Sequence, residues 1–450
     1  MKRRGRQNAR RKAAAPPVSR KIAPSHLVQI EKPIYGGAFL ARAQGKAVFV
    51  PLSLPGEQAR VRIVEEKPSY AAAEIDEIVR AAAERLPPAC PHFGACGGCH
   101  YQHADYAAQL AFKQAILRET LERGGVPAPD EIAVLAAEPW AYRNRIRLAF
   151  DPEGNAGYRS RRSHTVIPIR ECPIAAPLLV RTALAAGEQF RKFRRPSRPA
   201  ELSLFCDAAE NSVLASVFTS GAAEVPFVDY FGALLQQIPL LRGLELVEQH
   251  QNQLPRTIAQ AGEESLTYRA AGFDYRVSHG AFFQVNRWLV DELVDCVTDK
   301  CHGKLAWDLF AGVGLFARRL AQHFSRVLAV ESSPASMEAL TRNLAGTSAT
   351  AVNTAALDFL RSAPKTELPD LVVVDPPRTG LGAEVTALLE QIAVPALVYV
   401  SCNPATLARD LRALTGAGYK IELVTLADLF PQTYHLETVV RLRQGNCPRT

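Results

Sequence analysis

The sequence lacks any run of apolar residues close to the roughly 20 that a helix needs to cross a bilayer. Its basic start has no apolar stretch behind it, so we expect no secretory signal. Cysteines are scarce: the nine in 450 residues are odd in number and thinly spread, which argues against a disulfide framework. These absences indicate a cytoplasmic protein in a reducing compartment, with no membrane partner.

Acidic side chains are absent from the first 21 residues, which hold nine Lys and Arg. The remaining residues have 44 Lys and Arg against 45 Asp and Glu, so the whole net charge of +8 lies on this segment. We expect residues 1–21 to form a disordered tail that binds a polyanion, although a tail that only aids solubility fits the same charges. A second basic region, residues 140–200, contains more Arg than Lys, which suits bidentate recognition of phosphate.

The length and the hydrophobic fraction of 48% indicate a folded, multi-domain protein. Short strands separated by glycine turns predict a small OB-like β-barrel over residues 22–80, and barrels of this size often bind oligonucleotides. Residues 81–280 mix strands with a helix at 106–123, which predicts a central α+β domain. Strands and helices alternate over residues 281–450, which predicts a doubly wound, Rossmann-like α/β domain.

A glycine-rich loop follows the first strand of the predicted α/β domain. That strand ends at Asp308, and Gly312 and Gly314 allow the backbone to approach a bound nucleotide closely. The next strand ends at Glu331, which places a carboxylate where ribose hydroxyls would lie. The same spacing fits a nicotinamide dinucleotide, so the loop alone does not identify the cofactor.

Three residues near later strand ends carry groups suited to catalysis. Asp375 follows a buried strand and begins a rigid Asp-Pro-Pro-Arg turn, at the sheet edge where such folds bind ligands. Cys402 lies between a strand and the first turn of a helix; a helix N-terminus lowers the pKa of a thiol, which favours a nucleophile over an inert core cysteine. Glu437 opens the last apolar strand and gains a role only if the chemistry needs a base.

Four segments together resemble the RNA uracil-C5 methyltransferases, which make 5-methyluridine from S-adenosylmethionine. They are Asp308-Leu-Phe-Ala-Gly-Val-Gly, Asp375-Pro-Pro-Arg, Ser-Cys402-Asn-Pro and His-Leu-Glu437-Thr. Residues 26–80 are similar to the N-terminal TRAM barrel of that family. The likeness extends over residues 20–445.

The resemblance implies a role for each matching residue. It implies four contacts to S-adenosylmethionine, from Gln284, Phe310, Glu331 and Asp375. Cys402 would be the nucleophile and Glu437 the base, with His435 as the competing base. Leu315 stands where relatives often have Asn, so we expect no side-chain contact from that position.

Three cysteines lie close together in the sequence and predict thiolate ligands. They are Cys90, Cys96 and Cys99. With Cys172 they match the family members that carry a [4Fe–4S] cluster. Structural zinc is the alternative, although zinc sites favour two closely spaced pairs of ligands.

The implied chemistry explains why a thiol and a base are needed. A thiolate that adds to C6 of uracil makes C5 nucleophilic towards a sulfonium methyl group, and a base then removes the C5 proton. The target base must leave its stack to reach the thiol, which costs least in a loop or bulge of folded RNA. We therefore expect the barrel, the arginine-rich region and the basic tail to bind folded RNA together. The resemblance favours 23S ribosomal RNA, with a transfer RNA uridine as the alternative.

Three other functions explain fewer of the motifs. An iron–sulfur or NAD oxidoreductase would leave Cys402 and Asp375 without a role. A methyltransferase of exocyclic amines would have an aromatic residue at the position of Arg378. An RNA-binding protein with a decayed catalytic domain would not keep every catalytic position filled. We therefore expect a monomeric RNA (uracil-C5)-methyltransferase.

Overall fold

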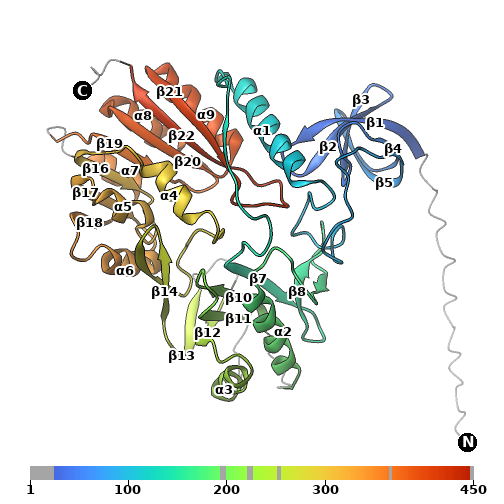
Figure 1. Cartoon of the computed structure of the whole chain (residues 1–450), viewed down its shortest axis with the longest axis horizontal. Helices are drawn as coiled ribbons and strands as arrows, with labels where there is room; N and C mark the ends of the chain where they lie inside the picture. Colours follow the sequence, from blue (N-terminus) through green and yellow to red (C-terminus); the bar gives the residue numbers. More distant parts are fainter. Residues whose placement is uncertain (1–24, 193–198, 220–226, 251–254, 364–366, 446–450) are drawn as a thin grey trace, which may run out of the picture.

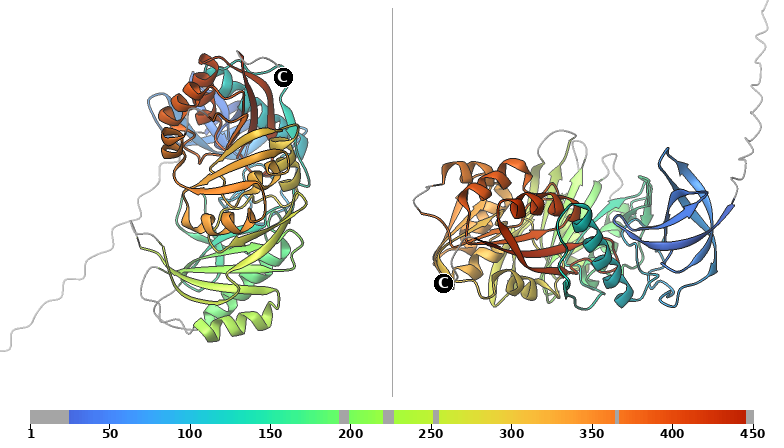
Figure 2. Two further views of the ribbon diagram at one scale, coloured as in Figure 1. Left: turned by 90° about the vertical axis from the view of Figure 1, so that its left-hand side faces the viewer. Right: turned by 90° about the horizontal axis from the view of Figure 1, so that it is seen from above.

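The computed structural model describes residues 25–192, 199–219, 227–250, 255–363 and 367–445. The predicted basic tail, residues 1–21, lies outside this described part. A barrel, a central sheet and a C-terminal sheet follow one another along the chain (Figure 1). Helix α1 (Tyr106–Arg123) lies between the barrel and the C-terminal sheet, and the view from above shows the same arrangement (Figure 2).

Alternating side chains build the N-terminal barrel that the sequence predicts. In β3 (Lys46–Pro51), Val48 and Val50 point inward and are buried. The strand order β1-β2-β3-β5-β4 is closed, so no sheet edge is left free. The other barrel strands are β1 (Ser25–Ile34), β2 (Ala38–Ala43), β4 (Gln58–Glu66) and β5 (Tyr70–Arg80).

The turn between β1 and β2 packs against the cysteine-bearing segment. Gly37 in this turn has a φ of 84°, and a Cβ atom there would lie 2.8 Å from the ring of His100. Glycine therefore allows a close approach that another residue would block. This contact fixes one end of the barrel to the segment that carries Cys96 and Cys99.

The central sheet has the strand order β13-β12-β11-β10-β7-β8-β9. Helices α2 (Pro177–Lys192) and α3 (Phe227–Gln237) contact each other and share a hydrophobic core with the sheet. The strands are β7 (Arg145–Phe150), β8 (Ala156–Arg159), β9 (Val166–Pro168), β10 (Pro199–Cys206), β11 (Val213–Thr219), β12 (Leu241–Glu248) and β13 (Arg256–Gly262). A hairpin of β14 (Ser265–Ala270) and β15 (Phe273–Ser278) leads to the C-terminal part.

The C-terminal sheet has the order β18-β17-β16-β19-β20-β22-β21-β6. Ala306 and Trp307 are neighbours in β16 but belong to different hydrophobic clusters, so a core covers each face. The strands are β16 (Gly303–Leu309), β17 (Phe324–Glu331), β18 (Ala349–Asn353), β19 (Leu371–Val374), β20 (Ala396–Ser401), β21 (Tyr419–Ala427) and β22 (Glu437–Gln444). The helices are α4 (Val290–Thr298), α5 (Leu315–Leu320), α6 (Pro334–Asn343), α7 (Ala356–Ser362), α8 (Gly382–Ile392) and α9 (Pro404–Gly416).

The predicted alternation of strands and helices is confirmed from β16 to α9, but some elements differ from expectation. The sequence patterns missed β18 and α7, which are short. Helix α1 and β6 (Ala133–Leu135) lie within the predicted central region, residues 81–280, yet both belong to the C-terminal part of the structure. Strand β6 pairs with β21 of the C-terminal sheet, and α1 packs against α9. None of the described helices is long and apolar enough to cross a membrane.

Candidate active site

Strand register brings the predicted nucleophile and base to one edge of the C-terminal sheet. Strand β22 runs antiparallel to β20, and Ser401 pairs with Thr438. Cys402 follows Ser401 and Glu437 precedes Thr438, so both lie at the same end of the two strands. Cys402 is half-buried and Glu437 is buried.

The glycine-rich loop and the Asp-Pro-Pro-Arg turn leave the same edge of the sheet. Leu309 of β16 pairs with Val374 of β19 on one side and with Val330 of β17 on the other. The residues that follow these three strands are therefore neighbours: Phe310 after Leu309, Asp375 after Val374 and Glu331 after Val330. Phe310 has a φ of 68°, which turns the chain out of the strand. Ligands of open α/β sheets bind at such a crevice.

Glu331 holds the glycine loop in place through backbone hydrogen bonds. Its carboxylate accepts from the backbone N–H of Gly312 at 2.9 Å, Ser332 at 2.7 Å and Ser333 at 2.6 Å. Each carboxylate oxygen has further lone pairs, so Glu331 can also accept from a ligand hydroxyl. The expected contact between Glu331 and the ribose of a bound donor stays a prediction.

Three carboxylates, buried or half-buried, lie at this edge of the C-terminal sheet. Asp308 is fully buried, and neither of its oxygens has a well-formed hydrogen bond within the described residues. Burial, with the neighbouring Asp375 and Glu331, raises the pKa of Asp308 to about 8. Burial also raises the pKa values of Asp375 and Glu437. A sulfonium and an ammonium group would relieve this repulsion, so the residues fit S-adenosylmethionine.

The thiol of Cys402 is less acidic than its place before helix α9 suggests. Burial, followed by Glu437 and Asp375, raises its pKa to about 11, and Arg378 lowers it only in part. The helix N-terminus is expected to lower this pKa, but the pKa is raised instead because the thiol is desolvated beside two carboxylates. Ligands that offset this negative charge will favour the thiolate.

Arg378 links the motifs around Cys402. Its backbone carbonyl accepts from the Asn403 side chain at 3.1 Å, which joins the two turns. Its guanidinium lies 3.4 Å from Nδ1 of His435. Burial, followed by Arg378, lowers the pKa of His435 to about 3, so its imidazole is neutral at pH 7 and a poorer base than a carboxylate. This favours Glu437 over His435 as the base.

Gln284 makes none of the hydrogen bonds described above for Glu331 and Arg378. It is buried in the loop between β15 and α4, and the side chain of Asn144 donates to its backbone carbonyl at 2.9 Å. The described contacts therefore explain how the loop is held. The expected contact between Gln284 and the methyl donor stays a prediction.

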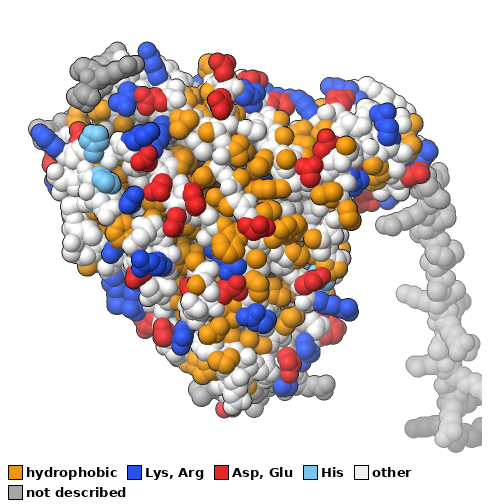
Figure 3. All heavy atoms as spheres, viewed as in Figure 1, with side chains coloured by type: hydrophobic (Ala, Val, Ile, Leu, Met, Phe, Trp, Pro, Cys, Tyr) orange, Lys and Arg blue, Asp and Glu red, His pale blue; other side chains and the backbone are white. Residues whose placement is uncertain are grey.

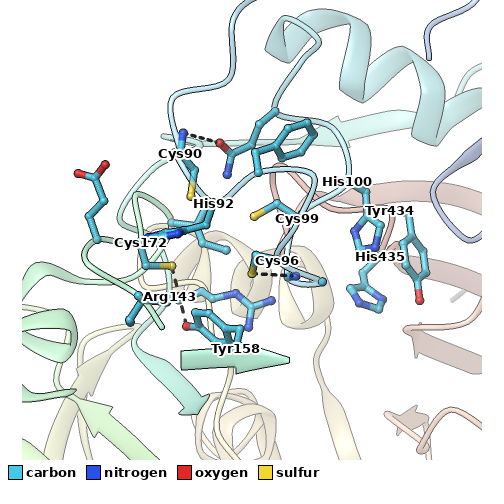
Figure 4. Close-up of a pocket in the computed structure, with 17 residues that line it drawn as sticks. Cys90, His92, Cys96, Cys99, His100, Arg143, Tyr158, Cys172, Tyr434 and His435 are labelled. Atoms are coloured by element: carbon cyan, nitrogen blue, oxygen red, sulfur yellow. Dashed lines mark hydrogen bonds between the residues drawn. The ribbon is translucent and has the colours of Figure 1, made fainter. Parts of the chain in front are cut away.

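The four predicted metal ligands line one cavity of about 310 Å³ (Figure 4). The sulfur atoms of Cys90, Cys96, Cys99 and Cys172 face this shared space. Within the described residues, no three His, Cys, Asp or Glu side chains form a ready group for a single metal ion. The backbone N–H of Gly98 lies 3.4 Å from the Cys96 sulfur.

A half-buried cation adjoins the cysteine cavity. Arg143 lines it, and its guanidinium lies beside the Tyr142 hydroxyl at 3.3 Å and over the Phe430 ring at 5.8 Å. No carboxylate lies within ion-pair distance of Arg143 in the described residues. Burial raises the pKa of Cys96 to about 11 and of Cys99 to about 12, so these thiols need a cation to ionise. The donor set fits an iron–sulfur cluster.

The arginines of the predicted RNA-binding region differ in what they contact. Arg145 lies over the Phe205 ring at 4.3 Å, and burial lowers its pKa to about 10. Arg147 pairs with Glu201 at 2.5 Å. These side chains support the central sheet as well as contributing charge. On the face shown in Figure 3, basic and acidic side chains are interspersed and form no single basic patch.

A groove of about 690 Å³ between the barrel and the central sheet gathers basic side chains. The arginines that line it are Arg147, Arg159, Arg161 and Arg162. The first two share Glu201, whereas Arg161 and Arg162 have no ion pair within the described residues. This groove is the stronger candidate for phosphate contacts.

The segment that leads to Glu437, residues 428–436, is called the catalytic loop below. The Asp428 carboxylate pairs with the buried Lys113 of α1 at 2.5 Å. The carbonyl of Gln432 accepts from the backbone N–H of His100 at 2.8 Å and of Tyr101 at 3.0 Å. Helix α1 and the cysteine segment thus hold the loop. Sequence reasoning missed these supports because no local motif marks them.

Comparisons with known proteins agree with this geometry. A family model described as tRNA (Uracil-5-)-methyltransferase matches residues 254–362 and 365–445, and a TRAM domain model matches residues 26–75. A 23S rRNA (uracil(1939)-C(5))-methyltransferase RlmD of Chromohalobacter salexigens is 33% identical over 443 residues, covering 92% of this chain and 88% of that protein. The RlmD of Halomonas elongata is 31% identical over 432 residues, covering 92% of this chain and 89% of that protein.

A solved structure supports the same assignment. The Pyrococcus abyssi tRNA (uracil-54, C5)-methyltransferase, in complex with S-adenosyl-L-homocysteine, has a TM-score of 0.74 and 25% identity, covering 93% of this chain and all of that one. Fold and site thus define an S-adenosylmethionine-dependent RNA methyltransferase. The chain belongs to the RNA uracil-C5 methyltransferase family, which confirms the resemblance in its sequence motifs and its TRAM barrel.

Proposed function

We propose that this enzyme methylates C5 of a uridine in 23S ribosomal RNA through a covalent bond between Cys402 and the uracil ring. The observation that carries the mechanism is the register of β20 and β22, which leaves Cys402 and Glu437 at one edge of the C-terminal sheet, beside the carboxylate of Asp375. The RlmD relatives support ribosomal RNA as the substrate. The transfer RNA enzyme among the solved structures keeps a transfer RNA uridine as the second candidate.

The reaction begins at Cys402. Its thiol releases a proton, and the thiolate sulfur bonds to C6 of uracil while the C5–C6 double-bond electrons move into an enolate at C5 and O4. C5 then takes the methyl group from the sulfonium of S-adenosylmethionine, which leaves as a neutral thioether. Glu437 accepts the C5 proton, the C5–C6 double bond re-forms, and the bond from C6 to sulfur breaks to return the thiolate.

The local charges suit each step. Arg378 is the neighbouring cation of both Cys402 and Glu437, and it opposes the effect of burial on both acids. Because burial makes Glu437 a weaker acid, its carboxylate is a stronger base once ionised. We assign Asp308 to the ammonium group of the donor and Glu331 to its ribose. Gln284, Phe310 and Asp375 complete the proposed donor site.

We propose that Cys90, Cys96, Cys99 and Cys172 bind a [4Fe–4S] cluster. The four cysteines share one cavity of about 310 Å³, and the Gly98 N–H and the half-buried Arg143 suit the thiolate sulfurs of a cluster. When bound, the cluster supplies iron–thiolate bonds that cross-link the cysteine segment to the central domain.

The eight described cysteines are all free, which supports a reducing compartment such as the cytoplasm.

Mapping of 5-methyluridine tests the proposed substrate. Ribosomal and transfer RNA would be compared from cells with the gene, cells without it, and cells that carry only the Cys402→Ala variant. We expect one uridine of 23S ribosomal RNA to lose its methyl group in the last two strains. If only transfer RNA loses a methyl group, the substrate is a transfer RNA uridine. If neither RNA loses one, the proposed function is contradicted.

A further inference from the structure

An aromatic residue of the barrel reaches the catalytic loop. Tyr35 stands in the turn between β1 and β2, and its ring meets that of Tyr434 edge to face, with centroids 5.5 Å apart. Tyr35 remains 37% exposed, so part of its side chain is accessible to solvent. Residues almost 400 positions apart in the sequence thus share one surface.

The ring contacts continue towards the base. Tyr434 lies 4.4 Å from the ring of His435, at an interplanar angle of 39°. His435 is two residues before Glu437 and contacts Arg378. The pKa of Tyr35 agrees with this path: burial and Tyr434 raise it most, and Cys402 and Glu437 also contribute. Tyr35 therefore lies at the outer end of a short aromatic path to the site of methylation.

The arginine groove begins at the same place. Gly36, Gly37 and Tyr434 line it together with Arg161 and Arg162, whose charges have no carboxylate within ion-pair distance among the described residues. Proteins that bind unpaired nucleic acid combine a basic groove for the backbone with aromatic rings for the bases. The groove supplies the basic surface for the backbone, and the exposed part of the Tyr35 ring supplies an aromatic surface for a base.

We propose that Tyr35 stacks on an unpaired RNA nucleobase that neighbours the target uridine, so that the barrel forms one wall of the substrate site. This inference rests on the proposed function, since it requires a uridine at Cys402. Flipping a base out of its stack leaves its neighbours unstacked, and an aromatic ring at the rim replaces part of that lost contact. The close contact of Gly37 with His100 keeps the barrel turn at the rim.

Tyr70 provides a matched control on the same barrel. It is 36% exposed and its ring lies 5.3 Å from that of Phe49, so it resembles Tyr35 in exposure and in ring contact. We expect Tyr35→Ala to raise the Kd for the 23S fragment that the wild type methylates by about 5- to 150-fold. Tyr70→Ala and Tyr35→Phe should change it less than threefold. The affinity for S-adenosylmethionine should stay unchanged in all three variants.

Abasic RNA identifies the stacked base. A series of fragments, each lacking one base beside the target uridine, would be bound to the wild type and to Tyr35→Ala. One abasic position should weaken wild-type binding but leave binding by Tyr35→Ala unchanged. Equal losses in Tyr35→Ala and Tyr70→Ala, or additive effects at every position, would overturn the inference. If the wild type neither binds nor methylates the fragment, the proposed function fails instead.

Discussion

Gln109 of helix α1 fixes the catalytic loop through a pair of amides. Its side-chain oxygen accepts from the backbone N–H of Gln432 at 3.0 Å, and its side-chain nitrogen donates to the Gln432 side chain at 3.0 Å and to the Ala104 carbonyl at 2.9 Å. Both glutamines are buried, and Gln432 has a φ of 66°, so its conformation needs this support. The chain reaches Glu437 five residues later.

The substitution Gln109→Leu removes all three bonds and leaves the Gln432 N–H buried without a partner. Each unsatisfied group costs about 1–3 kcal/mol, so we expect the free energy of unfolding to fall by about 2–4 kcal/mol. A displacement of the base by about 1 Å costs on the order of 100-fold in rate, so kcat should fall at least tenfold while KM for RNA changes little. Gln114→Leu in the same helix is the control, because its side chain donates only to the Ile132 carbonyl.

Hydrogen exchange and kinetics together check this reasoning. The amides of residues 428–436 should exchange faster in Gln109→Leu than in Gln114→Leu, and methylated covalent complex should accumulate because proton removal is slowed. If both variants lose stability equally and keep the wild-type kcat, Gln109 only stabilises the fold. If exchange in the catalytic loop is unchanged, the amide pair does not hold it.

Three further predictions use the charges and thiols of the structure. The raised pKa of Asp308, about 8, means that the folded protein keeps a proton that the unfolded chain loses near pH 4, so this residue's contribution to stability falls as pH rises from 4 to 8. Asp308→Asn should flatten that loss in thermal unfolding scans. It should also reduce the rise in affinity for S-adenosylmethionine that calorimetry should show for the wild type between pH 6 and 8, and the part that remains is expected from Asp375. A wild-type affinity independent of pH contradicts this. Reversing Arg161 and Arg162 to Glu should weaken RNA binding and make its salt dependence shallower, and an unchanged salt slope would remove the groove from the RNA path. Anaerobically purified wild type should be brown with about four irons per chain, which Cys99→Ser should lose, whereas colourless protein with zinc alone would show a zinc site.

The positions of most elements followed from the sequence, because glycine and proline mark their ends. The sequence pattern predicts a strand over residues 396–401 and a helix over 404–415, and the structure has β20 at Ala396–Ser401 and α9 at Pro404–Gly416. Helix α7 was missed because seven residues are too few to establish a helical period. The place of α1 and β6 on the C-terminal sheet depends on tertiary pairing, which local patterns do not contain.

The candidate residues were identifiable one at a time, but their relations were not. The pairing of Ser401 with Thr438 depends on the antiparallel register of β22, which the sequence does not specify. The pKa of Cys402 depends on carboxylates from other strands, so the local helix N-terminus gave the wrong direction. Arg145 and Arg147 are two residues apart in β7 and so lie on one face of that strand, but only packing shows that this face is partly covered.

The central claim is that Cys402 bonds to C6 and Glu437 removes the C5 proton. It is tested most directly by the mass of Glu437→Gln after incubation with S-adenosylmethionine and the 23S fragment, under denaturing conditions. We predict a species equal to protein plus RNA plus one methyl group, absent from Cys402→Ala, and trapped likewise by the wild type on RNA that contains 5-fluorouridine. Free Glu437→Gln protein that turns over at the wild-type rate, or activity retained by Cys402→Ala, would contradict the account.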